Sequence, residues 1–380
     1  MSERRNNRRK GKTMTNHTEQ NLTERIQAIR AKWGRRLLIL GHYYQRPEIL
    51  AVADARGDSF QLSATAAQNN DCEVIVFCGV HFMAETADLL ANAPKKRDAR
   101  SGRRVRVLLP DAEAGCPMAD MATLSEVERA WSELGEWVET ADIAPITYVN
   151  SSAAIKAFCG ARGGIACTSS NAGAVLRSAL ATRSRLFFMP DQHLGRNTAL
   201  AMGIPPEEIL LWHGRGASPA KFGGNSPEAV RSARVFLWDG FCPVHQLFSV
   251  EQIARIRADD PKTNIVVHPE CEQAVVAAAD TAGSTKKILD VVTESPAESH
   301  WAIGTERRMV EALEAAFPDK TILPLAPEKP ECLTMARITL ENLCRTLEAL
   351  DAGQTVPTIE VPEPLANDAR LALERMLACR

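Results

Sequence analysis

Three times along this chain, an apolar run of strand-like composition ends in a loop that carries a cysteine. Each loop closes a larger unit in which two earlier apolar runs alternate with segments of helical pattern. Every unit therefore reads strand, helix, strand, helix, strand and cysteine loop. In a chain of 380 residues, this recurrence predicts three similar layered domains rather than one continuous sheet. The three loop cysteines are Cys116, Cys242 and Cys332.

The apolar runs indicate the fold class. They are short, continuous and rich in β-branched residues or leucine, as strands buried on both faces are, and cover 36–40, 74–79, 105–109, 143–149, 185–189, 235–238, 264–267, 301–303 and 321–325. Helical patterns fill segments between them, such as 48–56, 123–139, 225–234, 248–258, 272–280 and 306–316. This alternation favours parallel sheets covered by helices. We expect an α/β protein of three pseudo-threefold-related, three-layer α/β/α domains around a central cavity.

The repeat also suggests where the domains begin and end. We expect a first α/β domain at residues 22–118, completed by C-terminal helices at 333–380. A second domain should cover 119–244 and a third 245–332. Residues 1–21 begin with MSERRNNRRKGK, which is basic and poor in apolar residues, and we expect this tail to be disordered.

Composition excludes several classes of protein. The net charge of −2 favours neither nucleic acid nor an anionic membrane as a partner. The sequence has no apolar run long enough to span a bilayer and no secretory h-region near its first residues. We therefore expect a cytoplasmic protein, in which ten cysteines argue against a disulfide framework.

Polar side chains follow the first apolar run of each unit. They form pairs two positions apart, which are His42 with Tyr44, Tyr148 with Asn150, and His268 with Glu270. Residues at this spacing in an extended segment point the same way, and parallel sheets bind ligands beyond the carboxyl ends of their strands. Histidine beside a phenol or a carboxylate supplies proton donors and acceptors near neutral pH. These pairs are candidates for proton transfer in one cavity.

A small hydroxyl residue stands near an expected helix start in each unit, at Ser59, Ser169 and Thr285. A hydroxyl at a helix N-cap, together with free backbone N–H groups and the positive end of the helix dipole, can hold carboxylate or phosphate. Plain capping of the helix is the alternative for each residue taken alone. Three such groups facing a shared cavity favour anion binding.

The loop cysteines lie too far apart in the sequence for a local zinc ribbon. Their equivalent places in three units would instead bring three thiolates to one axis, where they could hold a metal centre that lacks one protein ligand. An incidental placement of the three is the alternative. Cys167 and Cys271 also lie at strand ends or turns and stay open as candidates, and His245 follows Cys242 closely enough to share its site.

The middle run of each unit ends near His81, His193 and Glu306. The surrounding motifs, GVHFMAETA and PDQHLGRN, fit either a functional role or hydrogen bonding between domains. No Walker loop, GxGxxG after a strand or GxSxG elbow is present, so neither a bound nucleotide nor a serine nucleophile is indicated.

Taken together, the motifs resemble those of the quinolinate synthase family, iron–sulfur enzymes of de novo NAD biosynthesis. The resemblance covers roughly residues 22–350 and rests on GHYYQRPEI, GDSFQLS, FCGVHFMAETA, YVNSSAAIKA, CTSSNA, MPDQHLGRN, VHPEC, ADTAGST, IGTE and the stretch from Cys332 to LENL. The family fold, three pseudo-symmetric α/β domains around a cavity, agrees with the repeat. One departure is that PEKPEC lacks the CxxC of some members, so we do not expect a redox switch there.

The resemblance implies a set of site residues. Cys116, Cys242 and Cys332 would bind a 4Fe-4S cluster with one open iron, which sets aside Cys167 and Cys271. Substrate contacts carry over to His42, Tyr44, Ser59, Tyr148, Asn150, Ser169, His268, Glu270 and Thr285, with His245 beside the cluster. The implied catalytic residues are His42, Tyr44, His245, His268 and Glu270, and we take Glu270 as the base because the first-strand clusters hold no other carboxylate apart from Glu48.

The implied reaction joins iminosuccinate, supplied by an L-aspartate-oxidising enzyme, to dihydroxyacetone phosphate. Phosphate and water leave, quinolinate forms, and the open iron acts as a Lewis acid in this transferase reaction. Two other readings remain. One is a cluster-bearing electron carrier or redox sensor, which would need no polar substrate cavity. The other is a diphthamide-forming radical enzyme, which also places distant cysteines in repeated domains but acts on a protein.

Overall fold

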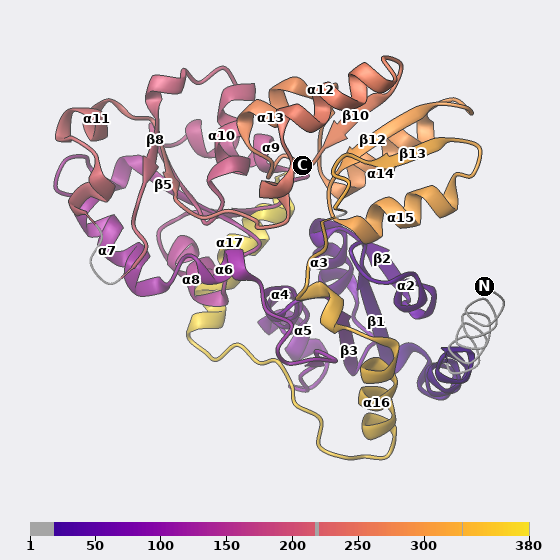
Figure 1. Ribbon diagram of the computed structural model, residues 1–380. Helices are drawn as coiled ribbons and strands as arrows, with labels where there is room; N and C mark the ends of the chain where they lie inside the picture. Colours follow the sequence, from indigo (N-terminus) through magenta and orange to yellow (C-terminus); the bar gives the residue numbers. More distant parts are fainter. Residues whose placement is uncertain (1–18, 217–219, 329, 380) are drawn as a thin grey trace.

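The computed structural model describes residues 19–216, 220–328 and 330–379 and has three lobes, each built on one sheet (Figure 1). Residues 1–18, most of the expected disordered tail, lie outside the described residues. Residues 19–33 are helical, so 19–21 belong to a helix rather than to the tail. Among the described residues, none of the helices combines the length and the apolar character that a membrane crossing requires.

Every strand pairing in the three sheets is parallel. The first sheet has the order β2-β1-β3-β4 and consists of β1 (Leu37–His42), β2 (Ala55–Gly57), β3 (Val74–Cys78) and β4 (Arg106–Leu108). The second has the order β6-β5-β7-β9-β8 and consists of β5 (Ile143–Tyr148), β6 (Ile165–Cys167), β7 (Arg185–Met189), β8 (Ile209–Trp212) and β9 (Val235–Trp238). The third has the order β11-β10-β12-β13 and consists of β10 (Asn264–Val267), β11 (Thr281–Ala282), β12 (His300–Gly304) and β13 (Thr321–Pro324). We call the units built on these sheets the first, second and third domains.

Helices cover both sides of each sheet (Figure 1), which confirms the predicted three-layer α/β/α class. The first domain has α2 (Pro47–Val52), α3 (Ser59–Gln68), α4 (His81–Ala91) and α5 (Pro94–Ala99). Next come α6 (Pro117–Asp120), α7 (Leu124–Leu134), α8 (Ala153–Ala161), α9 (Ala172–Leu180), α10 (Gln192–Ala201) and α11 (Pro227–Ser232). The third domain has α12 (Val250–Asp259), α13 (Gln273–Ala278), α14 (Thr285–Glu294) and α15 (Arg307–Ala316), and the chain continues through α16 (Leu340–Asp351) and α17 (Leu365–Ala378).

All the apolar runs predicted as strands form strands, but β2, β6, β8 and β11 were not predicted. Each of these four lies at the edge of its sheet and is two to four residues long. β2 (ARG) and β11 (TA) contain no apolar run, whereas the run ILLW that forms β8 was present in the sequence and was missed. The extra strand β8 also explains why the second unit of the repeat is longer than the others.

The common strand order positions the site. In each sheet the first strand lies between the second and the third. The chain passes from the first strand to the second on one side and then crosses back to the third on the other side. Ligands bind at such a switch point, beyond the carboxyl ends of the strands. The strands that end at a switch point are β1, β5 and β10, and those that lead into the cysteine loops are β4, β9 and β13.

Hydrogen bonds join neighbouring domains near the middle strands. Glu85 Oε2 on α4 accepts from the backbone N of Ala153 on α8 at 3.0 Å. Asn197 Nδ2 on α10 donates to two carbonyl groups of the third domain, each at 2.9 Å. The motifs around His81 and His193 thus supply hydrogen bonds between domains, the structural alternative left open by the sequence. His81 itself is exposed, with Nε2 3.7 Å from Glu85 Oε1.

The two C-terminal helices pack on different domains, although the sequence led us to place both with the first. α16 lies beside the helix at 19–33, where Trp33 Nε1 donates to Asp351 at 2.9 Å. α17 lies against α8 and β6 of the second domain. Gly160 on α8 permits this close approach, because a Cβ at that position would stand 1.8 Å from the Asp368 carbonyl oxygen. One apolar core cluster accordingly runs through the first two domains and both helices, whereas the third domain has two clusters of its own.

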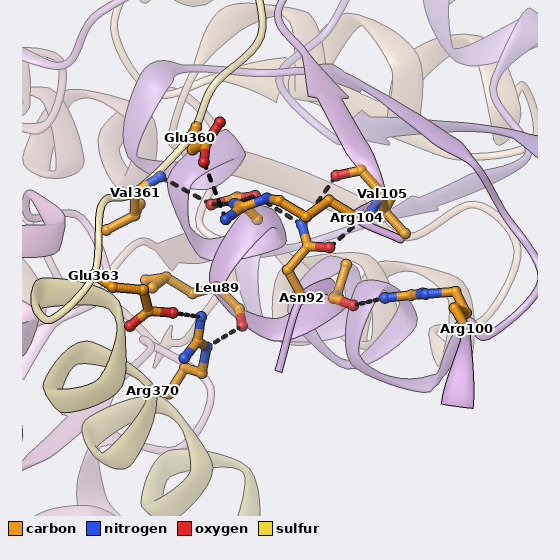
Figure 2. Close-up of polar contacts among 11 residues, drawn as sticks. Leu89, Asn92, Arg100, Arg104, Val105, Glu360, Val361, Glu363 and Arg370 are labelled. Carbon is orange, nitrogen blue, oxygen red and sulfur yellow. Dashed lines mark hydrogen bonds and ion pairs between the residues drawn. The ribbon is translucent and has the colours of Figure 1, made fainter. Parts of the chain in front are cut away.

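Figure 2 shows the polar contacts that attach the segment before α17 to the first domain. Asp88 on α4 is buried, and its two carboxylate oxygens accept from Arg104 Nη2 at 2.7 and 2.9 Å. Its Oδ2 also accepts from the backbone N of Val361 at 2.9 Å. Arg104 in turn lies 3.1 Å from Glu360, and Arg370 of α17 donates to a backbone carbonyl of α4 at 2.9 Å. Asp88 is therefore the acceptor on which this attachment depends.

Replacing Asp88 with alanine is expected to lower the free energy of unfolding by about 3 kcal/mol, because the change leaves Arg104 and the Val361 N–H without their buried acceptor. Urea denaturation of Asp88→Ala beside the parent chain measures this loss. Glu360→Ala is the matched control, since its exposed carboxylate pairs with the same arginine and should cost less than about 1 kcal/mol. Equal effects of the two substitutions would contradict the role given to Asp88.

Candidate active site

The three domains surround one cavity, in which the space that a water molecule can occupy is about 70 Å³. Every residue predicted as a metal ligand, substrate contact or catalytic group lines it: His42, Tyr44, Ser59, Cys116, Tyr148, Asn150, Ser169, Cys242, His245, His268, Glu270, Thr285 and Cys332. The remaining lining residues, which the sequence did not single out, are Asp58, Val80, Phe82, Met83, Met118, Thr168, Val244, Thr334 and Met335. Polar groups that converge in one concave site suit a small-molecule ligand.

His42 and His268 have the same local geometry in two different domains. The Nδ1 atom of His42 accepts from the backbone N of Tyr44 at 3.1 Å, and that of His268 accepts from the backbone N of Glu270 at 3.4 Å. An accepting Nδ1 carries no proton, so the proton of each neutral ring is on Nε2. Burial lowers the pKa of His42 to about 4 and that of His268 to about 3. At neutral pH both rings are therefore uncharged and can donate a hydrogen bond from Nε2.

Glu270 is a buried carboxylate surrounded by these groups. Burial by itself would raise its pKa, but the His268 and His245 imidazoles and the Tyr148 phenol outweigh burial and lower the pKa of Glu270 to about 2. The site thus holds a negative charge at neutral pH.

His245 connects Glu270 to the first domain. Its Nδ1 lies 2.8 Å from Glu270 Oε2, and its Nε2 lies 3.2 Å from Thr305 Oγ1. The same Thr305 oxygen is 2.8 Å from the Tyr44 hydroxyl. The contact between His245 Nδ1 and Glu270 Oε2 is short enough for an ion pair. It lacks the geometry of a hydrogen bond, and Nδ1 has no hydrogen-bond partner among the described residues. The His245 ring also stacks on His268, with the centroids 4.5 Å apart.

Thr305 is a residue of this network that the sequence did not single out. It is buried and joins Tyr44 to His245, although the IGTE motif had drawn attention only to its neighbour Glu306. Its place at the end of β12 was the signal that could have identified it. Burial and the Glu270 charge raise the pKa of Tyr44 and of Tyr148 well above 10, so both phenols remain protonated.

The three hydroxyl residues stand at helix starts, but none is the N-cap. Ser59 and Thr285 are the first residues of α3 and α14, whose N-caps are Asp58 and Ser284. Ser169 lies in the turn before α9. The expected N-cap role is therefore wrong. Aspartate and serine are both strong capping residues, so the preceding position takes the cap and the predicted hydroxyl is left to line the cavity.

The cysteine side chains bring three soft donors to the cavity, one from each cysteine loop. Burial raises the pKa of Cys116 to about 12, and burial with the nearby charge of Glu270 raises that of Cys242 well above 9. The thiols therefore stay protonated until a metal displaces the protons. Cys332 is held by its backbone N, which donates to Glu306 Oε1 at 3.2 Å. Three thiols beside Met118 and other apolar side chains suit an iron–sulfur cluster.

A second grouping in the cavity suits a single ion. One ligand atom each of Cys242, His245 and Glu270 lies within 4.8 Å of the other two. Cys167 and Cys271, the other cysteines considered from the sequence, are fully buried and do not line the cavity. Asn150 lines it with a buried Oδ1 that has no hydrogen-bond partner among the described residues. Such an atom is suited to a polar ligand.

Residues 24–378 match the family model described as quinolinate synthetase A protein. A quinolinate synthase of Rhodopirellula baltica is 51% identical over 94% of this chain and 91% of its own length. A quinolinate synthase of a Geobacillus strain is 49% identical over 93% of this chain and 92% of its own length. One of Herpetosiphon aurantiacus is 48% identical over 94% of this chain and 92% of its own length. These similarities confirm the resemblance that the motifs indicated.

Proposed function

Because the chain belongs to the quinolinate synthase family, we propose that it forms quinolinate from iminosuccinate and dihydroxyacetone phosphate, with loss of phosphate and water. The observation that carries the proposal is the composition of the single cavity, where three thiols, buried proton-transfer groups and three hydroxyl residues at helix starts meet. Neither an electron carrier nor an enzyme acting on a protein requires so many polar groups to converge in one cavity. A partner enzyme that oxidises L-aspartate would supply the iminosuccinate.

Cys116, Cys242 and Cys332 would hold a 4Fe-4S cluster and leave one iron without a protein ligand. When bound, the cluster supplies a Lewis acid that can polarise a carboxylate or hydroxyl of the substrate. Glu306 positions the third of these loops through its hydrogen bond from the Cys332 backbone. The remaining work of binding and proton transfer falls to the other side chains of the cavity.

The anionic parts of the substrates would bind at the helix starts. Ser59 and Thr285 offer hydroxyls at the first positions of α3 and α14, where free N–H groups and the helix dipole favour negative charge. Ser169 presents a third hydroxyl from the second domain, and Asn150 adds a polar group beside Tyr148. A dicarboxylate and a phosphate can thus be held by neutral donors, with little competition from water in the enclosed part of the cavity.

Proton transfer would use the buried groups at the other strand ends. The His42 and His268 rings donate from Nε2 to oxyanions, and the phenols of Tyr44 and Tyr148 donate likewise. Glu270 accepts a proton. Its pKa of about 2 makes it a weak base in the free protein, but an anionic substrate in the same cavity raises that pKa by like-charge repulsion. The base therefore strengthens when substrate is present.

Anaerobic, cluster-loaded protein incubated with iminosuccinate and dihydroxyacetone phosphate is expected to release quinolinate, phosphate and water. Chromatographic detection of quinolinate tests this directly. Reactions that omit dihydroxyacetone phosphate, or that use protein stripped of metal, are the controls and should give none. A fully loaded sample that yields no quinolinate from both substrates would overturn the proposed reaction.

A further inference from the structure

One side chain contacts the helix starts of both other domains. Ser170 of the second domain lies in the turn before α9, and its Oγ is 2.6 Å from Asp58 Oδ2 of the first domain. The same Oγ is 2.9 Å from Ser284 Oγ of the third domain. Asp58 is the N-cap of α3 and Ser284 is the N-cap of α14. The Ser170 hydroxyl thus joins all three domains at one point, which we call the clasp.

The Ser170 hydroxyl is the donor in both hydrogen bonds. It has a single proton, which Asp58 Oδ2 and Ser284 Oγ share as acceptors. Each cap also receives a backbone donor from its own helix. Asp58 Oδ1 accepts from the N of Gln61 at 2.8 Å, and Ser284 Oγ accepts from the N of Lys287 at 3.3 Å. The clasp therefore runs from the first turn of one helix, through Ser170, to the first turn of another.

Each member of the clasp is next in sequence to a hydroxyl that lines the cavity. Asp58 precedes Ser59 and Ser284 precedes Thr285, whereas Ser170 follows Ser169. Thr285 is buried, and its side chain makes no hydrogen bond to another described residue, so its hydroxyl remains available to a ligand. The three lining hydroxyls lie on separate domains, and the clasp fixes how they stand relative to one another.

We propose that Ser170 is a positioning residue. It fixes the relative positions of the hydroxyls of Ser59, Ser169 and Thr285, which bind the anionic substrate. This inference rests on the proposed function, because it concerns the same cavity. A shift of one domain by a fraction of an ångström would misplace one of three anchors for a single anion, and binding that depends on all three is sensitive to such shifts. Ser170 is exposed whereas Asp58 and Ser284 are buried, so its replacement should leave the domain cores intact.

The test compares three variants of the cluster-loaded enzyme. Ser170→Ala removes the shared hydroxyl, and we expect the KM for dihydroxyacetone phosphate to rise about tenfold while kcat stays within about threefold, the pattern of lost ground-state binding. Ser170→Thr retains the hydroxyl and has room for its methyl group at this exposed position, so it should restore the KM. Ser226→Ala is the matched control, an exposed serine directly before α11 in the same domain, and should behave as the parent enzyme.

Calorimetric titration of the same samples with inorganic phosphate separates this inference from the reaction itself. If the parent enzyme makes quinolinate and Ser170→Ala keeps its KM, or loses kcat and stability together without a change in KM, the clasp has no positioning role. If the parent enzyme makes no quinolinate, the proposed reaction fails and the titration decides. About tenfold weaker phosphate binding by Ser170→Ala than by Ser226→Ala supports the clasp, and equal binding or none by the parent enzyme overturns it.

Discussion

Replacing Cys116, Cys242 or Cys332 with alanine is expected to remove the iron–sulfur cluster and lower quinolinate formation about a thousandfold. A thousandfold fall in rate corresponds to the loss of the several kcal/mol by which a metal Lewis acid stabilises charge in the transition state. Each of these thiols lines the cavity from a different cysteine loop, so none of them can be replaced by its neighbours. With only two thiols, the cluster would lose the protein ligand of a second iron and be released.

Iron and sulfide analysis of anaerobically purified protein measures this effect without relying on activity. The parent chain should contain about four of each per chain, and the three variants should contain little of either. Cys167→Ala is the matched control, because Cys167 is a fully buried cysteine that does not line the cavity. It should keep its iron. Retention of the cluster by any of the three ligand variants would remove that cysteine from the ligand set.

The same analysis distinguishes a cluster from a single ion bound by Cys242, His245 and Glu270. A single ion at that position would be lost from His245→Ala and kept by Cys116→Ala and Cys332→Ala. A cluster bound by three cysteines predicts the opposite result for all three variants. The two arrangements share only Cys242, so the pattern across the variants is decisive.

The sequence predicted the strands that matter for the site, because buried parallel strands are continuous apolar runs and chemically distinctive residues follow their carboxyl ends here. His42, Tyr148 and His268 each follow such a run, and the structure brings all three to one cavity. Strands β2 and β11 have no apolar run by which they could be recognised. The network through Thr305 could not be predicted either, since its distances depend on how separate domains pack.

Local sequence also could not decide the roles of neighbouring residues at helix starts. GDS and GST each contain two candidates for the N-cap, and the backbone places Asp58 and Ser284 there while Ser59 and Thr285 face the cavity. The packing of α17 on the second domain depends on a helix contact at Gly160 that no nearby residue specifies. These features arise from tertiary packing, which overrides what a short window of sequence indicates.

Replacing Glu270 with glutamine is expected to lower kcat by about a hundredfold to ten-thousandfold, the range associated with loss of a positioned general base. Glutamine has the same shape as glutamate but no charge and no proton-accepting carboxylate. Removing the Glu270 charge should lower the pKa values of His42 and His268 further, since that charge raises both. Both rings are already neutral at pH 7, so the substitution changes one charge and leaves theirs as they were.

The pH dependence of the parent enzyme follows from the same values. The pKa of Glu270 is lowered to about 2, so in the free enzyme the carboxylate is ionised throughout pH 5 to 8 and kcat/KM should show no step from its titration. In the complex, the substrate charge raises the pKa of Glu270, and any step it causes should appear in kcat at the acidic end of the profile. Such a step must be absent from Glu270→Gln.

Glu272→Gln is the matched control, because Glu272 is an exposed carboxylate two residues further along the same segment. Its kcat and pH profile should equal those of the parent enzyme, and all three samples should contain the same iron per chain. A rise in KM for Glu270→Gln with kcat unchanged would make Glu270 a binding group rather than the base. Full turnover by Glu270→Gln with an intact cluster would exclude it from proton transfer altogether. The base would then have to be sought in His245, because Nδ1 of His42 and of His268 already accepts a backbone hydrogen bond and their Nε2 carries the proton.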